Sequence, residues 1–149
     1  MDAIIKNIQD KLAEISFLHI DEDWGQLDYY SPNPPVKFPC VLLDVASANY
    51  SNIGKDKTKT PINRQHGACS LTVKVANLKL TNSSVKAPIL QKDAAFSVNG
   101  LIQQIHELLH GFNPEANSTG LIRVSRQRVI RDDGIQEYNI TYTFELNDV

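Results

Sequence analysis

Hydrophobic residues recur at helical spacing in two stretches of the chain. The first stretch follows Asp2, a residue type that caps helices, and predicts an amphipathic helix over residues 3–15. Its apolar stripe consists of Ile4, Ile5, Ile8, Leu12 and Ile15. The second stretch predicts a helix that starts near Pro88 or Asp93 and ends at His110. Its stripe consists of Val98, Leu101, Ile102, Ile105, Leu108, Leu109 and Phe112.

Alternating apolar and polar positions predict the strands. Residues 38–46, with the sequence FPCVLLDVA, carry apolar side chains on both faces, which is typical of a central strand. One of these faces holds Val41, Leu43 and Val45. In residues 69–78, apolar positions (Cys69, Leu71, Val73 and Val75) alternate with polar ones (Ser70, Thr72 and Lys74). The connector before them, residues 21–37, is rich in proline and predicts a short strand around Leu27 to Tyr30.

The end of the chain predicts a β-hairpin. Residues 120–130 and 135–146 flank Asp132-Asp133-Gly134, a strong turn signal. Regular alternation in the last strand predicts one buried face and one solvent-exposed face. The buried face is expected to hold Tyr138, Ile140, Tyr142, Phe144 and Leu146, and the exposed face Glu137, Asn139, Thr141, Thr143 and Glu145.

Together these elements predict an α+β fold, with a mainly antiparallel sheet of about four to five strands and two helices packed on one face. The 149 residues, 42% of them hydrophobic, suit a single domain over residues 1–149. The first residues lack the basic and apolar segments of a signal peptide, and no apolar run is long enough to span a bilayer. We therefore expect a protein made in the cytoplasm, without membrane contact.

A long polar segment separates two of the predicted strands. A loop of this length inside a compact domain is uncommon, so residues 48–66 are interpreted as a projecting arm or an extended hairpin. Its basic residues are Lys55, Lys57, Lys59 and Arg64. If the flanking strands pair across the arm, Cys40 and Cys69 lie at opposite ends of the ladder, which predicts two reduced thiols.

Charge is distributed unevenly along the chain. Residues 1–35 hold two Lys against seven acids, residues 36–92 hold nine Lys and Arg against two acids, and residues 93–149 hold four Arg against eight acids. This segregation suits one basic and one acidic surface, as in head-to-tail association of identical subunits, and it also suits an anionic ligand. The alternative is that the charges interleave in the folded chain.

The segment His106-Glu107-Leu108-Leu109-His110 fits the H-E-x-x-H pattern of zinc metalloproteases, in which two histidines one helical turn apart bind zinc and the Glu acts as general base. Helical geometry, however, places all three polar residues on the solvent-exposed flank of the second helix. Gly111 has the residue type that ends helices, which explains the His-Gly pair structurally.

A zinc protease also needs a third ligand. The extended motif fails, because Asn113 stands where it requires Gly and Ala116 where it requires His. A distant Glu137 or Glu145 could be proposed as third ligand, but both lie on the polar face of the last strand and nothing in the sequence distinguishes either. We therefore expect no catalytic residues, no metal and no cofactor. The zinc protease built on His106, Glu107 and His110 is kept as an alternative.

Four arginines crowd one strand of the terminal hairpin. They are Arg123, Arg126, Arg128 and Arg131. A phosphate-binding stripe that contacts DNA is one interpretation, but no aromatic residues interleave with the arginines and acidic residues follow directly. Ion pairs within or between subunits are the favoured interpretation.

The whole pattern resembles the tail-terminator, or tail-completion, proteins of long-tailed bacteriophages. The resemblance rests on chain length, on the order of the predicted elements and on two short motifs, Phe38-Pro39-x-Val41-Leu42 and Leu109-x-Gly111-Phe112. It covers nearly the whole chain. It implies a non-enzymatic subunit of a hexameric ring that caps the tail tube, ends its polymerisation and joins the tail to the head connector.

This resemblance leads to expectations about partners and location. The partners are other copies of the chain, the tail tube protein and the head-tail connector, with transient DNA contact, and the location is the tail of the virion. The residues expected at a subunit or tube interface are Lys55, Lys57, Lys59, Arg64, Arg126 and Arg128. A head-tail connector that contacts DNA is a further alternative, which a strong salt dependence of DNA binding would favour.

Overall fold

The computed structural model describes residues 1–16, 18–29, 35–79 and 81–149. Within these ranges the chain forms one five-stranded sheet in the order β1-β2-β3-β5-β4. The elements are α1 (Asp2–Leu12), β1 (His19–Glu22), the 3₁₀ helix η1 (Gln26–Asp28), β2 (Cys40–Lys55), β3 (Asn63–Leu78), α2 (Ile89–Ala95), α3 (Ser97–Leu109), β4 (Ile122–Val129) and β5 (Ile135–Leu146). β1 is parallel to β2, and the other neighbouring strands are antiparallel. The predicted α+β class is confirmed.

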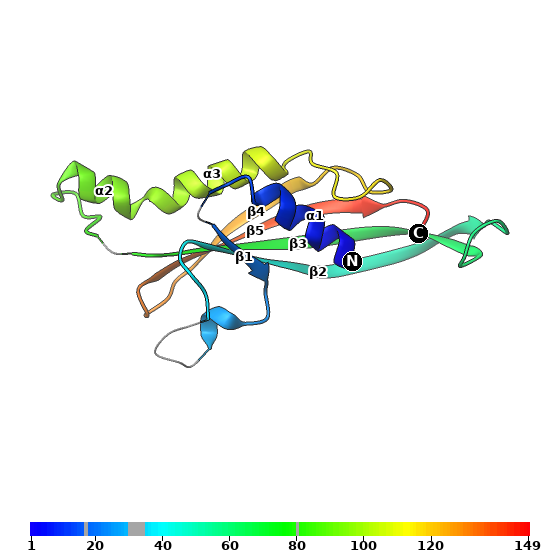
Figure 1. The fold of residues 1–149 in the computed structure, drawn as a ribbon, viewed down its shortest axis with the longest axis horizontal. Helices are drawn as coiled ribbons and strands as arrows, with labels where there is room; N and C mark the ends of the chain where they lie inside the picture. Colours follow the sequence, from blue (N-terminus) through cyan, green and yellow to red (C-terminus); the bar gives the residue numbers. More distant parts are fainter. Residues whose placement is uncertain (17, 30–34, 80) are drawn as a thin grey trace.

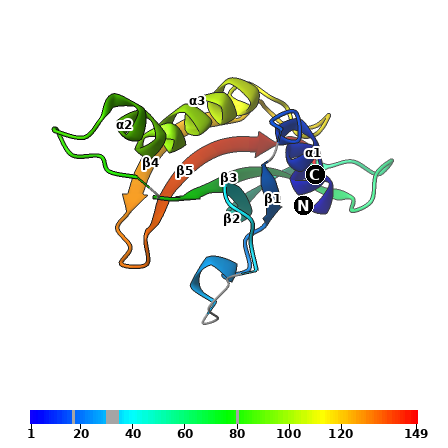
Figure 2. The same ribbon diagram turned by 60° about the vertical axis from the view of Figure 1, so that its left-hand side comes forward.

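The helices α1 and α3 lie on the same face of the sheet (Figures 1 and 2). α1 contacts β1 and β2, while α3 contacts β3 and packs beside α1. The β2–β3 hairpin continues past the helices and projects at one end of the long axis, and α2 lies toward the other end. In the part of the chain that the structure describes, every helix is too short or too polar to cross a membrane.

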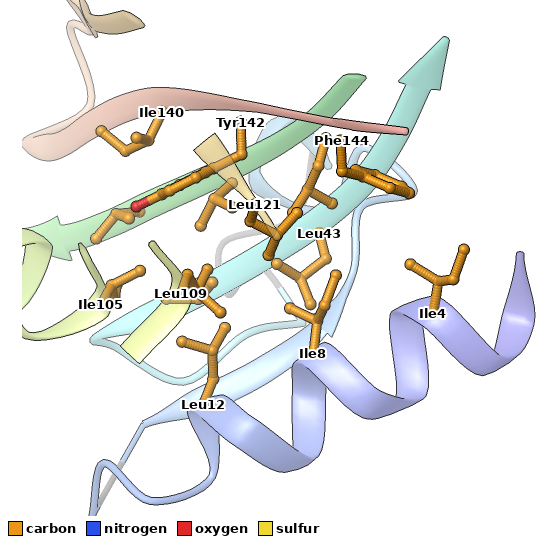
Figure 3. Packing of buried hydrophobic residues seen from close by; sticks show 14 of the residues in the cluster. Ile4, Ile8, Leu12, Leu43, Ile105, Leu109, Leu121, Ile140, Tyr142 and Phe144 are labelled. Carbon is orange, nitrogen blue, oxygen red and sulfur yellow. The ribbon is translucent and has the colours of Figure 1, made fainter. Parts of the chain in front are cut away.

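The main core forms between these helices and the sheet (Figure 3). The predicted stripe of α1 supplies Ile4, Ile8 and Leu12, each at most 1% exposed. The stripe of α3 supplies Val98, Ile102, Ile105 and Leu109. The sheet supplies the alternating residues of its central strands, which are Val41, Leu43, Leu71, Val73, Val75, Ile140, Tyr142 and Phe144. The predicted buried faces of these strands are therefore confirmed.

The second predicted helix is divided in the structure. α2 and α3 meet at Phe96, whose backbone (φ −98°, ψ 6°) departs from helical geometry. The single continuous helix was the wrong expectation, and the physical reason is the lack of anchoring: α2 buries only Ala95, whereas the stripe that contacts the sheet begins at Val98. The start of α1 also differs, because Asp2 lies in its first turn and Met1 takes the cap position.

The short strand expected around Leu27 is also wrong. Leu27 belongs to η1, and Tyr30 lies outside the described residues. Gly25 adopts φ 88°, and the Gln26 side chain accepts a hydrogen bond from the Trp24 amide and donates one to the Glu22 carbonyl. These contacts bend the chain into a turn. The extra strand is β1, which pairs with β2 from His19↔Cys40 to Glu22↔Leu43.

The predicted arm is the far end of the β2–β3 hairpin, so the expectation of an extended hairpin is confirmed. The two strands pair from Cys40↔Ala76 to Lys55↔Asn63. Cys40 lies at one end of the ladder, but Cys69 pairs with Ala48 near its middle, so the expected position at the opposite end was wrong, because the pairing extends into the arm. The two cysteines are still well separated along the ladder. Both thiols are buried and free. Burial raises the pKa of the Cys40 thiol to about 12.

The second face of the sheet is partly covered. Leu27 of η1 packs here in a small cluster with Cys40, Leu42, Ala76 and Ile135. The predicted exposed face of β5 is therefore exposed at Thr143 and Glu145 but covered at its other end, where Glu137 is only 4% exposed. The expectation was wrong for Glu137 because η1 packs against this part of the sheet.

Ile105→Ala tests whether the stripe of α3 holds the core together. Ile105 is 0% exposed, and shortening it removes buried methyl groups and leaves a cavity. We expect the free energy of unfolding to fall by about 2–5 kcal/mol in urea denaturation followed by circular dichroism. The control, Gln104→Ala, changes an exposed neighbour on the same helix and should stay within about 0.5 kcal/mol of the parent. Equal effects of the two changes would contradict this packing.

Candidate assembly surfaces

The H-E-x-x-H segment occupies the last turns of α3. Glu107 and His110 are exposed, but His106 is half-buried. Its ring stacks on that of Tyr142 with 6.4 Å between centroids, and its Nδ1 lies 3.5 Å from the Tyr142 hydroxyl. The expectation that all three residues are solvated was therefore wrong for His106. Tyr142 belongs to the buried face of β5, and its hydroxyl end reaches out beneath the helix.

The surroundings of His106 favour its neutral form. Burial lowers its pKa below the usual 6.5, and the positive charge of Arg123 lowers it further. His110 adds to this effect, since the two imidazole centroids are 4.8 Å apart. A neutral imidazole beside a tyrosine hydroxyl explains His106 as a packing residue at the edge of the core.

The third ligands considered for zinc lie in other contacts. Glu137 is paired with Arg131, and the Glu145 carboxylate is 3.7 Å from His66 Nε2. Among the described residues, no group of three or more His, Cys, Asp or Glu side chains is arranged to hold a metal ion. Gly111 ends α3 with φ 83° and donates its N–H to the Leu121 carbonyl at 2.7 Å, which confirms its predicted role.

The basic residues of the arm fall into two groups. Arg64 Nε lies 2.8 Å from Asp148 Oδ1, and Lys59 also bonds Asp148. These contacts hold the pKa of the Asp148 carboxyl below its usual value. The chain end is fixed beside them, since Gln65 and Val149 exchange two backbone hydrogen bonds. Lys59 and Arg64 thus tie the arm to the C-terminal segment.

Lys55 and Lys57 form the second group. Both are exposed, and neither makes an ion pair within the described ranges. Three large apolar side chains of the arm are also exposed, namely Tyr50 (49%), Ile53 (56%) and Ile62 (49%). Exposed cations together with exposed apolar side chains give the arm the composition of a contact surface.

The arginines of β4 point toward the helix-covered face of the sheet. Arg126 pairs in register with Ile140, and Arg128 with Tyr138. Their guanidinium carbons lie 4.7 and 6.0 Å from the centroid of the Tyr138 ring, and Arg126 also donates to Asn99 of α3. These contacts place a row of cations along the edge of the core, over an aromatic face.

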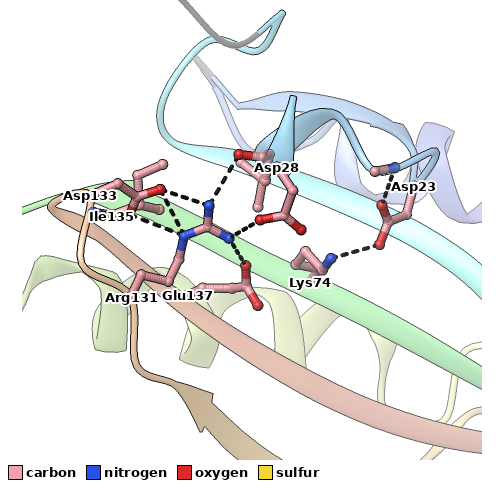
Figure 4. A network of polar contacts seen from close by, with 9 residues as sticks. Asp23, Asp28, Lys74, Arg131, Asp133, Ile135 and Glu137 are labelled. Atoms are coloured by element: carbon pink, nitrogen blue, oxygen red, sulfur yellow. Dashed lines mark hydrogen bonds and ion pairs between the residues drawn. The ribbon is translucent and has the colours of Figure 1, made fainter. Parts of the chain in front are cut away.

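Arg131, just beyond β4, lies at the centre of an ion-pair network (Figure 4). Its side chain is 11% exposed and reaches Glu137 at 2.8 Å, Asp28 at 2.9 Å and Asp133 at 2.7 Å. It also donates to the Leu27 carbonyl at 3.1 Å. Hydrogen bonding to Asp133 raises the pKa of Arg131 and lowers that of Asp133. The predicted use of these arginines in ion pairs is confirmed for Arg131, which joins η1 to the β4–β5 hairpin.

No protein-family model matches the chain, and no curated protein matches its sequence. The fold is similar to that of a chain in the solved structure of the virion of a native gene transfer agent particle, with a TM-score of 0.57 and 11% sequence identity. The match covers 98% of this chain and 96% of that chain. At this identity the likeness shows a shared fold across nearly the full length of both chains.

Arg131→Met tests the ion-pair network. The change leaves the Glu137 carboxylate, whose side chain is 5% exposed, without its cation. We expect the free energy of unfolding at neutral pH to fall by about 3–5 kcal/mol in urea denaturation. The double variant Arg131→Met with Glu137→Leu should recover most of that loss, because no buried charge remains. Arg128→Met is the matched control on the exposed edge. A loss no larger than that of the control would contradict the buried role of Arg131.

The pKa of His106 predicts a pH dependence of stability. Because this pKa is lower in the folded chain than the ordinary 6.5, the unfolded chain binds the proton more readily. The stabilisation is complete above 6.5 and is lost as pH falls from 6.5 toward the folded pKa. Between about pH 8 and pH 5, the melting temperature of His106→Phe should therefore drop less than that of the parent.

His110→Phe, at an exposed position one turn later, is the control for this experiment. NMR titration supplies an independent measurement on the parent protein. An imidazole of His106 that titrates at or above 6.5 would contradict the proposed environment.

Proposed function

We propose that this protein is a structural protein of a phage-like virion and that it acts as a tail terminator. In this role, copies of the chain form a ring, expected to be hexameric, that caps the tail tube and joins it to the head connector. The observation that carries the proposal is the end-to-end similarity in fold to a chain of a gene transfer agent virion, which spans 98% of this chain. The arrangement of helices, long hairpin and terminal hairpin also fits the resemblance to tail terminators.

The surface of the molecule supports assembly rather than catalysis. The projecting arm presents Lys55 and Lys57 together with exposed Tyr50, Ile53 and Ile62, and its far part is tied to the C-terminal segment through Lys59 and Arg64. A fixed projection with mixed cationic and apolar character suits a permanent contact with another protein. We propose that the tip of the arm, around Lys55 and Lys57, contacts a neighbouring subunit or the tail tube.

Ring formation is tested by native mass spectrometry and negative-stain electron microscopy of the purified protein over a range of concentrations. We expect a closed oligomer without bound metal, and rings in the micrographs. A chain that stays monomeric at every concentration and with tail tubes present would overturn the proposal. Zinc retained at one ion per chain would favour the protease alternative, and tight, strongly salt-dependent DNA binding the connector alternative.

The variant Lys55→Glu with Lys57→Glu tests the arm. Both side chains are exposed, so the melting temperature should stay unchanged while binding to the neighbouring subunit or tube weakens by about tenfold or more. Sedimentation with tail tubes measures binding to the tube, and native mass spectrometry measures binding between subunits. The control, Lys6→Glu with Lys86→Glu, makes the same charge change at exposed positions elsewhere. Equal assembly by both variants would rule out the arm as a contact.

A further inference from the structure

A row of paired residues crosses the whole sheet and ends in opposite charges. Glu22 on β1 pairs with Leu43 on β2, and Leu43 pairs with Val73 on β3. Val73 pairs with Ile140 on β5, and Ile140 pairs with Arg126 on β4. The three central residues are buried beneath the helices, so Glu22 and Arg126 lie on that same face at the two outer edges.

Both charges lack an ionic partner within the described ranges. Glu22 and Arg126 are exposed, and neither takes part in an ion pair there. Arg126 nevertheless has a defined position, since it donates to Asn99 and lies over the Tyr138 ring. A cation held in place by its own subunit loses little side-chain freedom when it meets an acid on another chain.

The two strand edges beside these charges differ. β4 is the last strand of the sheet, and the chain before it is covered because Arg123 donates its N–H to His110 Nδ1 and Leu121 bonds Gly111 and Phe112. From Val124 to Val129, no described residue bonds the outer backbone edge. β1 is the last strand on the other side, but the Glu22 carbonyl accepts from the Gln26 side chain and the Glu22 N–H donates to the Asp21 carboxylate. At Glu22 a neighbouring chain would therefore meet β1 through side chains.

Each charge also has an exposed apolar neighbour. β1 and β4 run in opposite directions, so positions after Glu22 and positions before Arg126 lie toward the same end of the sheet. Trp24 follows the end of β1, and Val124 lies at the bulge of β4. Each of these apolar side chains is 57% exposed. Both edges therefore combine a charge with exposed apolar surface.

We propose that β4 of one copy of this chain docks against β1 of the next copy, with Arg126 of the first paired to Glu22 of the second. If the next copy lies beside the first in the same orientation, the two strands meet antiparallel and the side chains of Arg126 and Glu22 face each other. This inference rests on the proposed ring and names its subunit contact. The contact joins two different edges, so it repeats head to tail, as closure into a ring requires.

The charges also disfavour a two-fold dimer through either edge. Two β4 edges facing each other would oppose the arginine rows, Arg123, Arg126 and Arg128, against themselves. Two β1 edges would oppose their acidic residues in the same way. The repulsion between like edges therefore selects the unlike pairing and with it the head-to-tail arrangement.

Charge reversal with rescue tests the contact. Glu22→Arg and Arg126→Glu should each weaken self-association by about tenfold or more, measured by native mass spectrometry and analytical ultracentrifugation. The double variant should assemble like the parent, because it restores the pair with the charges exchanged. The two single variants should also assemble when mixed in equal amounts, since every interface between alternating copies is then a matched pair. Neither rescue is expected of a change that only damages the fold.

The controls separate this inference from the proposed ring. Asp93→Arg reverses an exposed acid on α2 and should leave assembly unchanged. Arg126→Gln, which removes the charge without reversing it, covers the case in which Arg126→Glu lowers the melting temperature. Parent rings that are insensitive to the single variants, or single variants that neither the double change nor mixing rescues, would overturn the edge contact and leave the ring proposal standing. A parent protein that never self-associates would overturn both.

Discussion

The antiparallel pairing of β2 with β3 is the contact around which the rest of the molecule is arranged. It runs from Cys40↔Ala76 to Lys55↔Asn63, and it fixes which side chains face the helices. β1 attaches to the outer edge of β2, and the C-terminal hairpin attaches to the outer edge of β3 through β5. Because side chains alternate along a strand, a slip of one residue in this pairing would turn the core residues of one of the two strands to the other face of the sheet.

This constraint explains why the two faces of the sheet are built differently. The face beneath α1 and α3 is apolar over the width of the three central strands. Among the described residues, the other face is covered by η1 and its small apolar cluster, with Val36 and Phe38 packed against it, and charged contacts supplement the packing there. Arg131 binds the carbonyl of Leu27 and three carboxylates, and Lys74 lies 3.0 Å from Asp23. Breaking such a contact leaves a buried charge without a partner. These contacts therefore make the position of η1 on the sheet specific.

Elements with regular periodicity could be predicted from the sequence. The stripes of α1 and α3, the alternation in β5 and the turn at Gly134 each depend on neighbouring residues of one segment. The same holds for the arm, where the absence of a hydrophobic pattern between two strands indicated a projection. These features could be recognised because one buried face imposes its period on the local sequence.

The features that were missed depend on segments far apart in the chain. β1 spans four residues without alternation and is held by its parallel pairing with β2. Glu137 occupies a polar position of β5 and is buried only because η1 and Arg131 lie over it. His106 lies on the polar flank of α3, but the Tyr142 hydroxyl reaches it from the sheet. Periodicity predicts which face of an element is apolar, and it does not predict what covers the other face.

The geometry separates two directions of contact in the proposed ring. The edges of β1 and β4 lie across the strands, whereas the arm projects along them, beyond the helix-covered part of the sheet (Figure 1). Contacts through the edges would therefore join neighbours side by side, and the arm would reach toward what lies above or below the ring. Because Lys59 and Arg64 fix the arm to the C-terminal segment, its direction is set by the same sheet that sets the edges. A single rigid sheet can thus hold both kinds of contact in a constant relative orientation, which a cap on a tube of fixed symmetry requires.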